Sequence, residues 1–169
     1  MTQSYDFDFK ILIQPGSNLM VKLTGIIGNV TYDKIKPSIW VAQNTEIKRI
    51  LTKPLYDKIL EDFINASLDG VYKQIYEDYI AFMLVFYSTA DFVQRNSIMI
   101  ANGGNFKHSP DNAQIVDFKE VDRNANYYRD LGRFYEDQFK EFVKKNNVPE
   151  YDSSSNNNDN DFFFGVYML

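Results

Sequence analysis

The stretch that decides the fold is residues 79–90, YIAFMLVFYSTA, in which nearly every side chain is apolar. It is too short to cross a bilayer, because a membrane-spanning helix takes roughly 20 apolar residues. Polar residues precede it at Lys73, Glu77 and Asp78, and few follow until Asp91. This pattern predicts one long helix over residues 71–95 whose middle is buried on most sides and forms the centre of the core.

A second long helix is predicted over residues 116–146, and we expect it to pack within the same chain. Its large residues recur every seven positions, which is the spacing of a helix seam. The first row is Val121, Tyr128, Tyr135 and Phe142, and the adjoining row is Phe118, Ala125 and Phe139. The charged residues between these rows predict a solvent-exposed face with pairs four apart, such as Glu136 with Lys140.

Residues 31–69 predict the remaining helices. Apolar side chains recur there at helical spacing, at Ile35, Ile39, Ala42 and Ile47. Thr45 has the character of a helix N-cap, so two helices are expected to meet near Asn44. A third begins around Pro54, because proline in the first turn of a helix forfeits no internal hydrogen bond, and ends before Gly70.

Two irregular segments are predicted as short β structure. Within residues 1–30, brief apolar runs flank a Pro-Gly pair, which predicts an arm with one or two strands. Residues 96–113 predict a hairpin loop between helices. Its glycine pair serves either as a turn that needs positive φ or as a loop tip that contacts a partner. The candidate partner-binding residues of this loop are Asn102, Gly103 and Gly104.

The composition changes abruptly after residue 151. Residues 152–161, DSSSNNNDND, predict a flexible linker because no side chain there can anchor in a core. Residues 162–169 are mostly apolar and would promote aggregation if left in water. A ten-residue linker reaches about 15 to 20 Å, so this tail either folds back onto its own core or docks on another subunit. The candidate docking residues are Phe162, Phe163, Phe164, Val166, Tyr167, Met168 and Leu169.

Composition argues against several functional classes. A net charge of -5 argues against sequence-independent binding of nucleic acid, which needs clustered Lys and Arg. The chain has no cysteine and a single histidine, His108, so it offers no thiolate nucleophile and no paired imidazoles. No catalytic residue, cofactor-binding residue or metal ligand is therefore predicted. The first residues lack the features of a secretion signal, so we expect a cytosolic chain without a membrane span.

Aromatic residues exceed the need of one small core, since Phe and Tyr total 26 of 169 residues. Tyrosine has an apolar ring and a polar tip, which suits interfaces. We expect some of the following to face other subunits: Tyr72, Tyr76, Tyr79, Tyr127, Tyr128 and Tyr135.

The order of these features resembles a known family. Residues 33–51 (DKIKPSIWVAQNTEIKRIL), followed by Pro54-Leu55-Tyr56, resemble the opening of head-to-tail connector (adaptor) proteins of tailed bacteriophages, especially phages that infect Bacteroidetes, including the crAss-like group. The family continues with a long apolar helix, an Asn-Gly hairpin loop, a final helix rich in Tyr and charge, and a Pro-x-Tyr near its end. The resemblance covers about residues 31–151, and the N-terminal arm here is longer than in that family.

This resemblance implies a structural virion protein. Its subunits would form a homo-oligomeric, dodecameric ring in the virion neck, made in the host bacterial cytoplasm. The ring would bind the portal protein, carry the next ring or a tail protein, and leave a channel through which DNA passes without specific binding. An alternative is a soluble helical binding module that recruits one partner through residues 162–169.

The predicted fold class is mainly α, a bundle of about four to five helices with a short β hairpin or arm and extended terminal segments. The predicted organisation is an arm (1–30), a helical connector domain (31–151) containing the hairpin loop, a polar linker (152–161) and an apolar docking tail (162–169).

Overall fold

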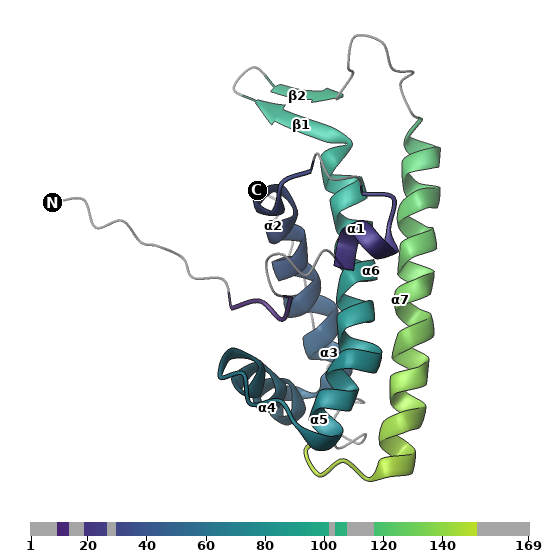
Figure 1. Ribbon diagram of the computed structural model, residues 1–169. Coiled ribbons are helices and arrows are strands. Elements are labelled where there is room, and N and C mark those ends of the chain that lie inside the picture. Colours follow the sequence, from purple (N-terminus) through teal and green to yellow (C-terminus); the bar gives the residue numbers. More distant parts are fainter. Residues whose placement is uncertain (1–9, 14–18, 27–29, 102–103, 108–116, 152–169) are drawn as a thin grey trace, which may run out of the picture.

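The computed structural model describes residues 10–13, 19–26, 30–101, 104–107 and 117–151, and the chain is mainly helical (Figure 1). Its centre is a pair of long helices that run side by side, α6 (Ala81–Asn96) and α7 (Phe118–Asn146). Helix α6 continues α5 (Gly70–Ile75) through a π-helical turn, η2 (Tyr76–Ile80), so the predicted helix over 71–95 is confirmed. No helix in the described ranges is long and apolar enough to cross a membrane.

The apolar run of α6 forms the core, as predicted. From Ile80 to Ala90 every side chain except Phe82 is buried. Burying one large aliphatic side chain stabilises a fold by about 1.5 to 3 kcal/mol, so this run contributes much of the hydrophobic driving force. The polar members Ser88 and Thr89 donate to the carbonyls of Leu84 and Val85, four residues earlier, which satisfies their hydroxyls inside the core.

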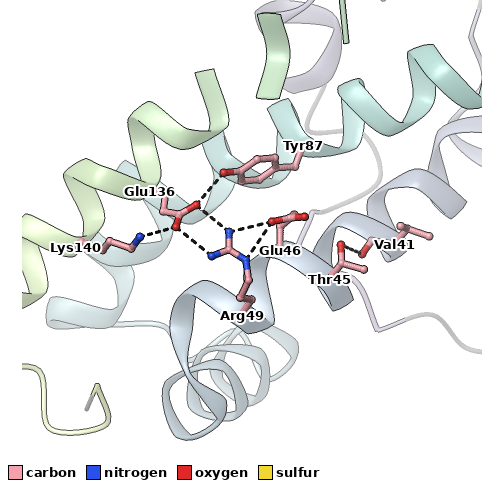
Figure 2. Close-up of polar contacts among 7 residues, drawn as sticks. All are labelled: Val41, Thr45, Glu46, Arg49, Tyr87, Glu136 and Lys140. Atoms are coloured by element: carbon pink, nitrogen blue, oxygen red, sulfur yellow. Dashed lines mark hydrogen bonds and ion pairs between the residues drawn. The ribbon is translucent and has the colours of Figure 1, made fainter. Parts of the chain in front are cut away.

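A second continuous helix packs against α6, and here one prediction is wrong. Helices α2 (Tyr32–Ala42) and α3 (Lys48–Leu51) do not meet at a break near Asn44 but are joined by a π-helical turn, η1 (Gln43–Ile47). Thr45 is not an N-cap, because its hydroxyl donates to the Val41 carbonyl at 3.0 Å within the same helix (Figure 2). The chain turns at Thr52, which has a φ of 64°, and α4 (Lys53–Ile64) follows as predicted.

The N-terminal arm also differs from the prediction. Leu19–Leu23 is a short helix, α1, and residues 10–13 form no strand. The backbone of Leu12 is bonded by side chains of the helical body, so it needs no partner strand. Helix α1 packs on α6, and the nearby Gly25 N–H donates to the Tyr128 hydroxyl of α7 at 3.1 Å.

The chain between α6 and α7 contains two short strands, β1 (Ile98–Ala101) and β2 (Gly104–Lys107), which lie within the range predicted as a hairpin loop. They pair antiparallel, with Ile98 opposite Lys107 and Ala101 opposite Gly104, and extend from the end of α6 (Figure 1).

The end of α7 is fixed by its own sequence. The helix ends at Asn146, the capping residue Asn147 adopts the left-handed conformation with φ 46°, and Pro149 cannot continue a helix. The next residues return to the body, because the Tyr72 hydroxyl donates to the Glu150 carboxylate at 2.7 Å and Thr52 donates to the Glu150 carbonyl. Tyr151 packs edge-on against the buried Phe139, with ring centroids 5.4 Å apart.

Candidate functional site

The residues predicted to bind partners fall largely outside the described part of the chain. This holds for Asn102, Gly103 and the docking residues Phe162, Phe163, Phe164, Val166, Tyr167, Met168 and Leu169. Gly104 is the first residue of β2. His108, the single histidine, also lies outside the described residues. The described part of the chain therefore does not test these predictions, and the features below are built from other residues.

The most concentrated polar feature is a cluster of five residues where α7 meets η1, α3 and α6 (Figure 2). We call it the Glu136 cluster, and its members are Glu46, Arg49, Tyr87, Glu136 and Lys140. The guanidinium of Arg49 donates two hydrogen bonds to the carboxylate of Glu136, at 3.3 and 3.0 Å. Lys140 donates to the same carboxylate at 2.6 Å, and the Tyr87 hydroxyl donates to it at 3.0 Å.

Glu46 completes the cluster from the side of η1. Its carboxylate accepts from Arg49 at 3.0 Å, so the guanidinium bridges two acidic groups. A planar guanidinium suits this role because its N–H groups form a rigid fork that matches carboxylates. Arg49 and Glu136, 87 positions apart in sequence, are joined in this way. The cluster therefore connects η1 and α3 to the central helices α6 and α7.

Glu136 is buried, with only 6% of its surface exposed, which overturns the prediction of a solvent-exposed Glu136–Lys140 pair. Burial alone would raise the pKa of Glu136, but the hydrogen bonds and charges of Arg49 and Lys140 outweigh it and lower that pKa. Burial, followed by the charge of Glu136, raises the pKa of Tyr87. The carboxylate is therefore ionised and Tyr87 is neutral at ordinary pH.

Gly132 explains how α7 approaches α6 closely enough to form this cluster. A Cβ atom at that position would lie 2.7 Å from Cε1 and 2.8 Å from Cζ of Tyr87. The missing side chain leaves the space that the Tyr87 ring occupies one helical turn before Glu136. A glycine inside a long, otherwise regular helix was the signal that could have indicated this close approach.

A cavity of about 400 Å³ opens beside the cluster. Three basic and three acidic side chains line it together with Tyr87, namely Arg49, Arg129, Arg133, Glu46, Glu136 and Asp137. The charges balance, so the cavity has no net preference for an anion or a cation. A carboxylate with a lowered pKa is a poor general base at neutral pH. In the described ranges no three His, Cys, Asp or Glu residues are grouped to hold a metal ion. The hydrogen bonds and ion pairs of the Glu136 cluster link α7 to η1, α3 and α6.

A contrasting feature lies on another face of α7. Tyr127 and Phe134 are seven residues apart, hence on the same side of the helix, and are 59% and 56% exposed. Each ring contacts its neighbour edge-on, Tyr127 on Tyr128 and Phe134 on Tyr135, with centroids 5.3 Å apart in both pairs. We call Tyr127 and Phe134 the aromatic stripe. Tyr127 is thus the predicted interface tyrosine that is most clearly available.

The exposed aromatic surface is supported from beneath. The ring of Tyr135 stacks on Phe82 of α6, with centroids 4.7 Å apart and planes 5° from parallel. Phe86 stacks on both Tyr128 and Tyr135. Rigid support of this kind lowers the entropy that a contact residue loses on binding. Phe118, expected in the apolar seam, is instead 45% exposed near the start of α7.

A sequence-family model matches most of the chain. Residues 47–161, more than half of the chain, match the model described as Family of unknown function (DUF6712). The chain belongs to this family. The matched part of this DUF6712 protein runs from the end of η1 through α7, and so includes Arg49, Tyr87, Glu136, Lys140 and the aromatic stripe. No curated protein and no solved structure matches the chain.

Proposed function

We propose that this DUF6712 protein is a structural subunit of a head-to-tail connector ring of a tailed bacteriophage. The observation that carries the proposal is the aromatic stripe. Two large aromatic side chains, more than half exposed, lie on the longest helix of the described chain and are supported by further stacked rings. Exposed aromatic residues on a rigid face are typical of protein interfaces, where Tyr and Phe are enriched.

Other features favour a structural role. The polar residues of the Glu136 cluster pair with one another and join helices, which suits a subunit that must keep its shape under load. The order of sequence features resembles connector proteins, as set out above. A net charge of -5 suits a ring with a channel through which DNA slides without adhering.

In this proposal the stripe contacts a like subunit within a dodecameric ring located in the virion neck. The portal protein binds one side of the ring, and the next ring or a tail protein binds the other. The apolar C-terminal residues then serve as a docking peptide for one of these neighbours, which would keep them out of water.

The test is assembly on the candidate portal, observed by negative-stain electron microscopy. We expect the wild-type protein to form a stacked ring and the double variant Tyr127→Ser, Phe134→Ser to lose it while its circular dichroism stays unchanged. The matched control is Lys144→Ser, an exposed residue of the same helix outside the stripe.

Two outcomes would contradict the proposal. Wild-type protein that stays monomeric with the portal argues against a ring. A monomer that still binds one partner through residues 162–169 instead favours the alternative, a helical binding module. Removal of residues 152–169 distinguishes these cases, because the module loses its partner while a ring held by the stripe still closes.

A further inference from the structure

Residues 10–13 pack against the helical body without regular secondary structure, and the backbone bends at Leu12 and Ile13. Ile11, Leu12 and Ile13 are 9%, 0% and 3% exposed, although the segment belongs to no helix or strand. Lys10 is exposed. The segment is therefore held by what surrounds it and not by its own secondary structure.

The polar contacts of this segment are made to its backbone. The side-chain amide of Gln43 accepts from the Leu12 N–H at 2.8 Å and donates to the Lys10 carbonyl at 2.9 Å. The Tyr76 hydroxyl donates to the Leu12 carbonyl at 2.8 Å. Both backbone groups of Leu12 are thus satisfied by side chains of the body, in the way that a neighbouring strand would satisfy them.

Gln43 and Tyr76 are also held by contacts that do not involve the segment. Gln43 is 1% exposed, and its amide nitrogen also donates to the Tyr56 hydroxyl at 2.8 Å, which fixes the orientation of the amide. Tyr76 packs against Phe63, with ring centroids 5.0 Å apart, and burial raises its pKa to about 12, so it remains a donor.

The two clamping residues share an unusual position. Gln43 is the first residue of η1 and Tyr76 is the first residue of η2. A π-helical turn redirects the side chains around it and often occurs at functional sites. Here both π-helical turns of the described chain present a side chain to the same residue, Leu12.

We propose that the surface formed by Gln43, Tyr56 and Tyr76, called the peptide groove below, is a receptor for a short apolar peptide, and that its ligand, residues 10–13, is interchangeable between copies of this chain. The recognised chemistry is a free backbone N–H and two carbonyls flanked by aliphatic side chains. Only residues 14–18 separate the segment from α1, which stays on its own body through α6 and Tyr128. The same residues of a second copy make identical contacts, which is the basis of segment exchange. This inference does not rest on the proposed function.

The test uses the full-length chain with a protease recognition sequence in place of residues 14–18. After cleavage, a fluorescent peptide of residues 5–14 is added and its binding is followed by anisotropy. We expect the peptide to bind the cleaved protein and not the intact one, whose groove is filled. A peptide carrying Leu12→Asp should not bind, whereas Lys10→Ala, which alters an exposed side chain, should bind with unchanged Kd.

Two substitutions test whether the hydrogen bond from the Leu12 N–H to Gln43 contributes to peptide binding. A peptide with an ester in place of the Leu12 amide lacks the N–H that donates to Gln43. It should bind about tenfold more weakly. Gln43→Leu in the cleaved protein should lower the affinity for the unmodified peptide by at least the same factor. Because the ester tests the same hydrogen bond without altering the protein, it remains decisive if the variant fails to fold.

Either of two results overturns the proposal. One is a cleaved protein that keeps its helical circular dichroism but takes up no peptide. The other is equal affinity for the amide and ester peptides. If cleavage unfolds the protein, added peptide must restore the helical signal, and failure to restore it counts equally against the groove.

Discussion

Two faces of α7 reverse the usual distribution of side chains. On the face towards α3 and α6, Glu136 is 6% exposed and accepts from Arg49, Lys140 and Tyr87. Only two residues earlier, Phe134 is 56% exposed. A charged group can lie inside because partners from three elements satisfy it, whereas the Phe134 ring remains largely in solvent. Substitutions on the two faces should therefore affect different properties.

Among substitutions within the Glu136 cluster and the aromatic stripe, the largest effect on folding is expected for Glu136→Ala. It leaves the Tyr87 hydroxyl without its acceptor and places Arg49 and Lys140 together without their shared carboxylate. Arg49 and Lys140 regain hydration because their side chains are 55% and 39% exposed. We therefore expect a loss of about 2 to 3 kcal/mol in the free energy of unfolding, measured with chemical denaturant.

Glu136→Gln is the matched control, because it keeps the side-chain volume and an oxygen for Tyr87. Since the folded pKa of Glu136 lies below its ordinary value of 4.5, the ionised carboxylate stabilises the fold above that pH. This contribution is lost as pH falls through the lowered folded pKa. The stability difference between wild type and Glu136→Gln should hence shrink below pH 4.5, and a difference independent of pH would contradict the charged link.

A somewhat smaller effect is expected for Gly132→Ala. In an open helix this change stabilises by up to about 1 kcal/mol, but here the new methyl group would lie 2.7 Å from the Tyr87 ring. We expect a net loss of about 2 kcal/mol from overpacking. A double-mutant cycle with Tyr87→Ala provides the check, since the cost should vanish once the ring is absent. Equal costs in both backgrounds would show that the ring is not what Gly132 accommodates.

The smallest effect on folding is expected for Phe134→Ser. Its ring contacts Tyr135 but is mostly in solvent, so the free energy of unfolding should change by about 0.5 kcal/mol or less. Phe139→Ser is the matched buried control, because Phe139 is 0% exposed and should cost about 3 kcal/mol or more. Similar losses in thermal or denaturant unfolding for the two variants would remove the distinction between the faces.

Elements with a strong local pattern could be predicted from the sequence. The apolar run 79–90 indicated the core helix, and the recurrence of large residues every seven positions indicated α7. Proline in the first turn marked the start of α4. In each case the deciding information lies within one or two turns of the chain, so no knowledge of distant neighbours was needed.

The Glu136 cluster and the peptide groove could not be predicted in this way. Glu136 has a helical neighbour of opposite charge at Lys140, which is the usual pattern of a solvated face. Its burial depends on Arg49, which lies 87 positions away. The groove depends on the π-helical turns, and neither QNTEI nor YEDYI differs visibly from an ordinary helical sequence.

Those two turns have a consequence for how the groove could be gained or lost. A π-helical turn is equivalent to an α-helix into which one residue has been inserted. Deleting a single codon within η1 or η2 would restore regular geometry and rotate the residues on one side of the deletion by about 100° relative to the other. Gln43 or Tyr76 would then turn away from Leu12 with its own chemistry intact. The ability to hold a peptide can thus depend on a three-nucleotide difference in length.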